Sequence, residues 1–246
     1  MRKFTEWQSR MREYLGDTIN ELLFPRHCPV CDHVVPYKRL ICPECYPLLH
    51  KVSEPACRKC GKPLKKAEEE YCTDCGVKKH FFTQGRAVFQ YDGAMKQSIY
   101  RFKYANRQEY AEFYGTQAVK TLNDFFRQVQ ADLLVPVPLY AAKMRKRGFN
   151  QAQCFAQAIS KYTGISVDTK TVVRIRNTTP QKELDELGRQ NNLKKAFKIG
   201  RNDVKLKTII VIDDIYTTGS TIDAVAQVLL EAGAKRVYFV VLATGK

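Results

Sequence analysis

Eight cysteines near the amino terminus constrain the fold of this chain more than any other feature of its sequence. They form four Cys-x-x-Cys pairs. In such a loop both thiolates can reach one tetrahedral ion, so two loops complete a structural zinc site with no open position. We therefore expect two structural Zn²⁺ ions, held by Cys28, Cys31, Cys42, Cys45, Cys57, Cys60, Cys72 and Cys75.

The spacing of these pairs repeats. Ten residues lie between Cys31 and Cys42, and eleven lie between Cys60 and Cys72, which predicts a double zinc ribbon over residues 26–80. Sequential pairing is the simplest assignment, but the spacing leaves interleaved pairing open. Redox-active dithiols are the alternative, which four pairs in a row disfavour. A segment with so few large apolar residues needs metal in order to fold.

The amino-terminal residues 1–25 are predicted to form an amphipathic helix, because apolar side chains recur near helical period up to Phe24-Pro25. No apolar run is long enough to cross a membrane, and no secretory signal precedes the cysteines. We expect a cytoplasmic protein. Peripheral contact of this helix with the inner face of the membrane is the alternative to its packing on the protein.

Residues 81–246 show the pattern of an α/β domain. Near-continuous apolar runs at 208–212 and 237–242 are typical of buried parallel strands, and a further strand is predicted at 133–135. A helix over about 221–231 connects the first two runs, which makes a βαβ unit. Ligands of such sheets bind beyond the carboxyl ends of the strands, so the residues after Ile212 are the first place to look for chemistry.

Those residues combine two carboxylates with a glycine and several hydroxyls. Asp213 and Asp214 can accept hydrogen bonds from a sugar diol or hold Mg²⁺. Gly219 allows a tight turn, and the free N–H groups of the following helix favour an anion. A simple helix cap would explain one hydroxyl, not four. The segment therefore predicts a phosphate loop beside a diol-binding acidic pair.

The segment Val211–Thr221 resembles the phosphoribosyl-pyrophosphate (PRPP) signature of type I phosphoribosyltransferases. In that family the acidic pair contacts the ribose, the loop binds the 5′-phosphate, and Mg²⁺ accompanies the pyrophosphate. The resemblance assigns Asp213 and Asp214 to the ribose and to catalysis. Some members carry a carboxylate where Thr217 stands, and its absence argues against purine salvage. The phosphate would be bound by Thr217, Thr218, Gly219, Ser220 and Thr221.

Additional motifs resemble the ComF/ComFC competence family over nearly the whole chain. The resemblance implies a type I phosphoribosyltransferase-like parallel sheet with flanking helices, preceded by the cysteine-rich zinc ribbon. It also implies a role in DNA uptake during natural transformation. The motifs are the Phe24-Pro25 entry to the cysteines, Val135-Pro136-Val137-Pro138-Leu139, Arg145-x-Arg147-Gly148-Phe149-Asn150-Gln151, and Thr178-Thr179-Pro180-Gln181 followed by Arg189, Asn192 and Ala196-Phe197.

The net charge of +16 lies mostly after residue 80, which favours a polyanionic ligand. The cations near Gly148 suit a pyrophosphate or a nucleic-acid backbone equally well, and a solvated basic turn is the alternative. Residues 176–195 are interpreted as a lid over the ligand, with a disordered loop as the alternative. The expected pyrophosphate or DNA contacts are Lys143, Arg145, Arg147, Gln181, Arg189 and Asn192.

Three functions remain open at this point. One is a phosphoribosyltransferase that joins a nitrogen nucleophile to C1 of PRPP, with the acceptor unknown. The second is a single-stranded DNA-binding protein that uses Tyr100, Phe102 and Tyr104, although aromatic side chains at this spacing more often belong to a core. The third is an adaptor whose zinc ribbon docks a helicase or another uptake protein. We favour binding of PRPP or a related ligand, since a pure DNA binder has no use for the acidic pair.

Overall fold

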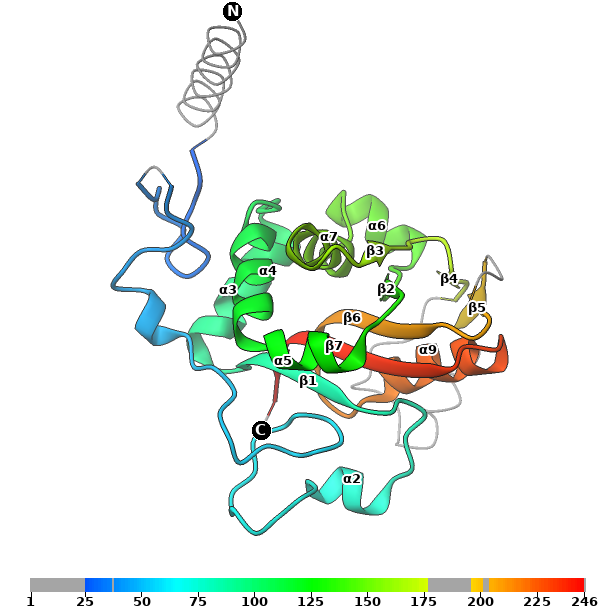
Figure 1. The fold of residues 1–246 in the computed structure, drawn as a ribbon. Coiled ribbons are helices and arrows are strands. Elements are labelled where there is room, and N and C mark those ends of the chain that lie inside the picture. Colours follow the sequence, from blue (N-terminus) through cyan, green and yellow to red (C-terminus); the bar gives the residue numbers. More distant parts are fainter. Residues whose placement is uncertain (1–24, 37, 177–195, 201–203, 246) are drawn as a thin grey trace, which may run out of the picture.

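The computed structural model describes residues 25–36, 38–176, 196–200 and 204–245. Within them a parallel sheet of five strands has the order β1–β7–β6–β2–β3 (Figure 1). Two further strands pair antiparallel as a separate small sheet, β4 (Val172–Arg174) with β5 (Phe197–Ile199). The strands of the main sheet are β1 (Gly85–Gln90), β2 (Leu133–Pro136), β3 (Ser166–Val167), β6 (Thr208–Tyr216) and β7 (Arg236–Thr244).

The predicted strands are all present, and the central one is longer than expected. β6 continues past Ile212 to Tyr216, because Asp213 pairs with Val241 and Tyr216 with Thr244 on β7. The acidic pair therefore belongs to the end of a strand rather than to the loop after it. This placement fixes both carboxylates against a rigid element of the sheet.

Helices cover both faces of the sheet (Figure 1). Apolar side chains of three helices, α3 (Gly93–Tyr104), α4 (Tyr110–Thr121) and α7 (Gln151–Thr163), share one buried cluster with alternate residues of β6 and β7. The other face is covered by α9 (Ser220–Glu231), whose Val225 and Leu229 belong to a second cluster. A sheet buried on both faces is what the continuous apolar runs predict.

Two shorter helices complete the α/β unit. The helix α4 ends at Thr121, and α5 (Asn123–Val129) follows after Leu122 as a separate element. The basic segment before Gly148 forms the helix α6 (Ala141–Arg147). It ends at Gly148, which has a φ of +80° that suits glycine.

The two cysteine modules pack against opposite faces of the sheet. Cys28 and Cys45 belong to the buried cluster of α3 and α4, whereas Cys57 and Cys60 belong to the cluster of α9. The chain between them, at 50–52, runs antiparallel along β1, with Val52 donating to Val88 and Gln90 donating to the carbonyl of residue 50. This pairing covers an otherwise open edge strand. The modules contain two short helices, η1 (Tyr46–Leu48) and α2 (Thr73–Val77).

Two predictions concern segments outside the described residues. The amino-terminal helix falls there except for Pro25, and so does most of the lid at 176–195. Among the helices that the structure does describe, none combines the length and the apolar character needed to cross a bilayer. The domain boundary at residue 80 stays a prediction, and buried contacts between the cysteine modules and the sheet cross it.

Candidate functional site

The loop between β6 and α9 has the geometry of an anion cradle. Residues 215–222 line a small hollow at the carboxyl edge of the sheet. Gly219, at the start of α9, has a φ of +79°, a conformation that strains residues with a side chain. No side chain of the described residues caps α9, so the structure shows no capping side-chain acceptor for the N–H groups of its first turn. Such free N–H groups, together with the helix dipole, attract a negatively charged group.

The hydroxyl side chains of this loop surround the same hollow. Thr217 and Thr218 are exposed, while Ser220 and Thr221 are half-buried. The hydroxyls of Thr218 and Ser220 lie 3.0 Å apart and hydrogen bond to each other. The structure thus brings together all five of the residues predicted for phosphate binding.

The acidic pair lies beside this cradle in a partly buried setting. Burial, and then the neighbouring Asp214 carboxylate, raise the pKa of Asp213 to about 7. The backbone N–H of Asp214 donates to the Asp213 carboxylate at 2.8 Å, which partly offsets this effect. The Asp214 carboxylate forms an ion pair with Lys103 of α3. The pair can therefore accept hydrogen bonds at a site where one carboxyl changes its proton near neutral pH.

Four cations from three elements form a cluster, two of which, Lys103 and Arg174, interact with the acidic pair. Burial, and then the charges of Arg174, Arg147 and Lys103, lower the pKa of Lys143. Arg174 of β4 also lies close enough to Asp213 for the two charges to interact. This excess of positive charge would suit a second anionic group, such as a pyrophosphate, beside the anion cradle at 217–221.

The sequence prediction covered only part of this cationic cluster. Lys143 and Arg147 were expected, and both are present. Arg145 is exposed on the same helix, and Gln181, Arg189 and Asn192 lie outside the described residues. Sequence reasoning missed Arg174 altogether, because a lone arginine in a short strand carries no motif.

An aromatic surface adjoins these cations on α3. Tyr100 and Tyr104 are exposed, with ring centroids 4.9 Å apart, whereas Phe102 is completely buried in the core. The guanidinium of Arg147 lies 4.9 Å from the centroid of the Tyr104 ring and donates to its hydroxyl at 3.1 Å. The structure thus divides the aromatic stretch that the sequence left ambiguous into one core residue and two surface residues.

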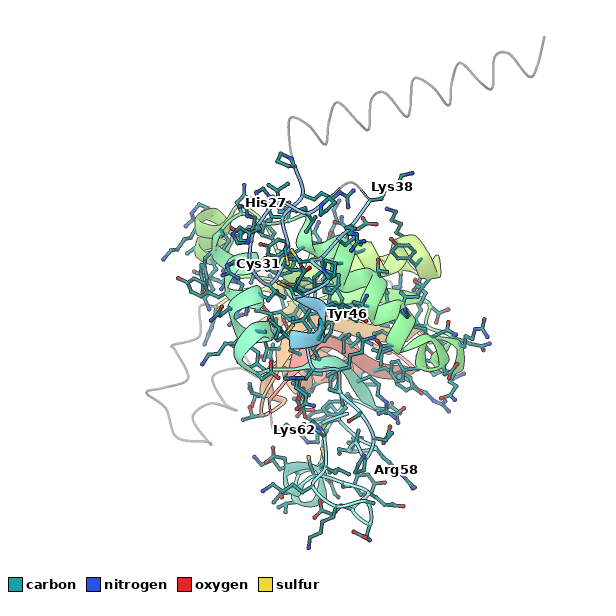
Figure 2. The ribbon with its side chains drawn as sticks, turned by 90° about the vertical axis from the view of Figure 1, so that its left-hand side faces the viewer. His27, Cys31, Lys38, Tyr46, Arg58 and Lys62 are labelled. Carbon is teal, nitrogen blue, oxygen red and sulfur yellow. The ribbon has the colours of Figure 1, made fainter. Side chains whose placement is uncertain are left out.

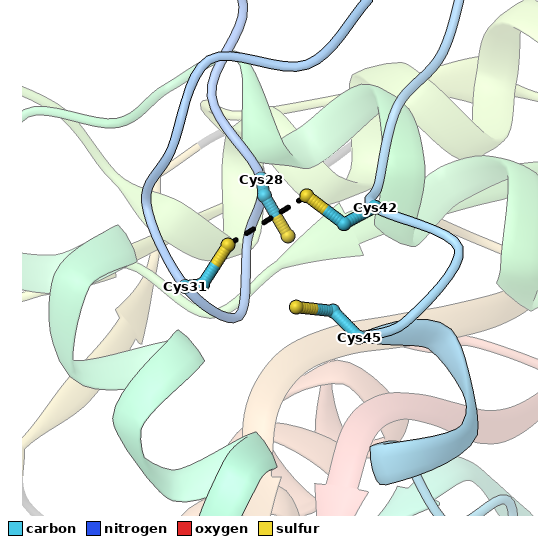
Figure 3. A group of neighbouring side chains, drawn as sticks. All are labelled: Cys28, Cys31, Cys42 and Cys45. Atoms are coloured by element: carbon cyan, nitrogen blue, oxygen red, sulfur yellow. Dashed lines mark hydrogen bonds between the residues drawn. The ribbon is translucent and has the colours of Figure 1, made fainter.

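The eight cysteines form two separate groups of four, each built from consecutive pairs. In each group the sulfur atoms all lie within 4.8 Å of one another. Figure 3 shows the first group, in which the sulfurs of Cys31 and Cys42 are 3.7 Å apart. The corresponding sulfurs of Cys60 and Cys72 are also 3.7 Å apart.

Tetrahedral zinc fits both groups. A Zn–S bond of about 2.3 Å places two sulfurs of a tetrahedral site about 3.8 Å apart, which agrees with the observed separation. Four thiolate ligands leave no open position, so both groups have the character of structural sites. The sequential pairing that the spacing favoured is the one present, and the interleaved alternative is wrong.

Comparison with known protein families divides the chain in the same way. The double zinc ribbon domain family matches residues 19–76, and the phosphoribosyl transferase domain family matches residues 147–246. The first match contains both cysteine groups. The second contains Arg147, the acidic pair and the phosphate loop.

Three relatives each match more than half of the chain. "DNA utilization protein YhgH" of Salmonella typhimurium is 29% identical over 214 residues, which cover 85% of this chain and 86% of that protein. "Competence protein F" of Haemophilus influenzae is 30% identical over 144 residues, 56% of this chain and 63% of that protein. "Competence protein ComFC" of Bacillus subtilis is 29% identical over 201 residues, 78% of this chain and 79% of that protein. With a double zinc ribbon followed by a phosphoribosyltransferase domain, the chain is a homologue of proteins named DNA utilization protein YhgH, Competence protein F and Competence protein ComFC.

Proposed function

We propose that this protein binds PRPP, or a closely related phosphoribosyl ligand, and acts in the uptake or use of DNA. The observation that carries the proposal is the position of the acidic pair. Asp213 and Asp214 lie near the end of β6, just before a glycine-containing anion cradle. Lys103 of α3 and Arg174 of β4 interact with them, and the α6 cations Lys143 and Arg147 adjoin these two. A site for phosphate alone would gain nothing from two carboxylates, which repel it.

Each part of such a ligand has a matching group in this arrangement. The 5′-phosphate would accept hydrogen bonds from the N–H groups and hydroxyls of the loop. The ribose hydroxyls would donate to Asp214, which then releases Lys103 toward the pyrophosphate. Asp213 can act as donor or acceptor toward a hydroxyl, because its pKa of about 7 makes both forms accessible at neutral pH.

Magnesium fits the same carboxylates. Asp213 and Asp214 are oxygen ligands of the type that Mg²⁺ prefers, and they would hold it directly or through water. When bound, the ion offsets the charge of the pyrophosphate. Lys143, Arg147 and Arg174 would supply the remaining positive charge that a departing pyrophosphate needs if the protein transfers the ribosyl group.

The proposal is tested by the thermal stability of the protein with PRPP and Mg²⁺. A ligand that binds only the folded state stabilises it by mass action, by about 2.7 kcal/mol at a concentration of 100 times its dissociation constant. We expect a rise in the melting temperature of the wild type and none in the double variant Asp213→Asn/Asp214→Asn. A rise of equal size in the double variant would show that the acidic pair does not hold the ligand.

Single-stranded DNA is a second candidate ligand, favoured by the exposed tyrosines. Tyr100 and Tyr104 are the kind of aromatic surface on which bases stack, and Arg147 and Lys143 add positive charge next to it. The corresponding test is the salt dependence of binding to an oligonucleotide. Loss of each phosphate contact should make the negative slope of log K against log salt less steep by about 0.7.

The variants for this test are Lys143→Gln and Arg147→Gln. Lys235→Gln is the control, because this exposed lysine precedes β7 and so lies at the opposite, amino edge of the sheet. An unchanged slope in the first two variants would exclude this surface. A role of the zinc ribbon in docking a helicase or another uptake protein, and a cytoplasmic location, stay predictions.

A further inference from the structure

The phosphate loop rests on side chains that connect it to the second cysteine module. Tyr216 is the last residue of β6 and is 2% exposed. Its ring stacks on Phe239, with centroids 4.8 Å apart, and meets the ring of Phe82 edge-on at 6.2 Å. Phe82 is completely buried and shares its apolar cluster with Cys57 and Cys60. The residue directly before the loop is thus embedded in the packing of the second module.

A partly buried ion pair of this module lies next to the same tyrosine. The ammonium of Lys62 lies 5.8 Å from the centroid of the Tyr216 ring and 2.9 Å from the carboxylate of Asp74. Lys62 is only 9% exposed and follows Cys60, while Asp74 lies between Cys72 and Cys75. The ion pair therefore links the two cysteine loops of the module next to the Tyr216 ring.

The other end of the loop is held by the chain that leaves the module. Asp223, in the first turn of α9, accepts a hydrogen bond from the His80 ring at 2.6 Å and one from the backbone N–H of Phe81 at 2.9 Å. The His80 side chain is 2% exposed and stacks on Phe82 at 4.7 Å. Contacts of the second module thus fix the backbone on both sides of the five loop residues.

The first module makes its contacts elsewhere. Its Asp32 pairs with Arg107 and accepts from the Tyr110 hydroxyl, and Tyr46 donates to Gln117 of α4. In Figure 2 Cys31 and Tyr46 lie beside the helices of that side, well apart from Lys62. The described contacts of the first module therefore concern α3, α4 and the turn between them, on the opposite face of the sheet from Tyr216.

We propose that the second zinc site, and not the first, holds the phosphate loop in the shape that binds an anion. Without zinc the two cysteine loops separate, Lys62 and Phe82 lose their positions, and the backbone at Tyr216 and Asp223 is released. Because coupling between two sites is reciprocal, a ligand in the loop tightens zinc binding at the second site. This inference rests on the proposed phosphate-loop function, but its first test needs no ligand.

That test is hydrogen exchange of the amides of residues 217–223 in two matched variants. Cys42→Ser and Cys72→Ser each replace the third cysteine of a module. Both cysteines are partly buried, and each lies 3.7 Å from its partner sulfur. We expect at least tenfold faster exchange of the loop amides in Cys72→Ser only, while the strand amides of β2 stay protected in both. Equal rates in the two variants, or faster exchange in Cys42→Ser alone, would overturn the proposal.

A third variant breaks the connection while leaving the metal in place. Tyr216→Leu should retain two zinc equivalents and show the same fast exchange of the loop. Tyr114→Leu is its control, because Tyr114 is equally buried but lies in the cluster on the opposite face. If the loop amides of Tyr216→Leu exchange as slowly as those of the control, the tyrosine does not transmit the effect and the proposal fails.

The second test uses the wild type and measures zinc release to a chelator, with and without PRPP and Mg²⁺. We expect two phases of equal size and at least tenfold slowing by the ligand of only the phase that is missing in Cys72→Ser. Slowing of both phases or of the other phase would contradict the coupling. If PRPP does not bind the wild type at all, the proposed ligand is wrong, and the exchange experiment alone decides the role of the second zinc.

Discussion

Replacement of Gly219 by alanine tests both the conformation of the loop and its contact with Tyr216. A Cβ atom at this position would lie 2.6 Å from the Tyr216 hydroxyl oxygen and 3.0 Å from two ring carbons. The left-handed backbone costs a residue with a side chain about 1–2 kcal/mol. Crowding of a packed region costs about 1–3 kcal/mol in addition. The free energy of unfolding should therefore fall by about 2–5 kcal/mol.

Gly164 offers a matched control for the backbone part of this cost. It has a φ of +72°, and a Cβ atom built on it would meet nothing within 4 Å. Gly164→Ala should lose about 1–2 kcal/mol, which for a chain of this size lowers the melting temperature by about 2–8 °C. Gly219→Ala should melt at a clearly lower temperature than this control.

The double variant Gly219→Ala/Tyr216→Phe isolates the crowding. Among the described residues the Tyr216 hydroxyl has no hydrogen-bond partner, so its removal alone should leave stability unchanged or raised. In the double variant the closest contact of the new Cβ becomes the 3.0 Å approach to the ring, and part of the lost stability should return. Calorimetric melting of the wild type, Gly219→Ala, Tyr216→Phe and the double variant measures these differences. The reasoning about this contact is refuted if Gly219→Ala melts at the same temperature as Gly164→Ala and PRPP still raises its melting temperature as much as that of the wild type.

Three further predictions concern protons, metal and biological output. The raised pKa of Asp213 means that the folded protein keeps a proton that the unfolded chain releases between about pH 4 and about pH 7. The unfolding free energy of the wild type should therefore fall over this range relative to that of Asp213→Asn. The prediction is contradicted if urea unfolding gives the same difference in unfolding free energy between the wild type and Asp213→Asn at both pH values. Cys28→Ser and Cys57→Ser should each lose about one zinc equivalent by elemental analysis, and retention of both ions would remove the assignment. In a transformable host, Gly219→Val should fail to restore the transformation frequency of a deletion strain while nucleotide salvage stays intact, and full complementation would make phosphate binding dispensable.

Local sequence patterns predicted the parts of the site that follow one another along the chain. The apolar run at 208–212, the carboxylates after it and the helix from about 221 place the acidic pair and the loop at a sheet edge. Cysteine spacing likewise predicted two metal groups. In both cases the relevant atoms are a few residues apart, so that chain geometry alone brings them together.

The remainder of the site depends on contacts between distant segments, for which the sequence carries no local signal. Lys103 reaches Asp214 because α3 packs against the sheet beside β6, and Arg174 reaches Asp213 from a strand that motif analysis does not single out. The spacing of the cysteines could not decide their pairing, since that depends on how the loops fold back. The length of β6 was also underestimated, because Asp213 and Asp214 are poor strand formers that pairing with β7 retains in the strand.

The division of the two buried clusters gives a reason for a metal module at this position. An anion cradle keeps its backbone N–H groups free for the ligand, so it cannot stabilise itself by its own hydrogen bonds. It has to be held from outside, and affinity depends on how well that support fixes it before the ligand arrives. Here the cations lie on α3, α6 and β4, which leaves the side of Tyr216 and α9 for support. Four thiolates on one ion can supply that rigidity in a segment too poor in apolar residues to form its own core. If the loop binds a phosphate as proposed, the second cysteine group belongs to that site as much as the loop itself does.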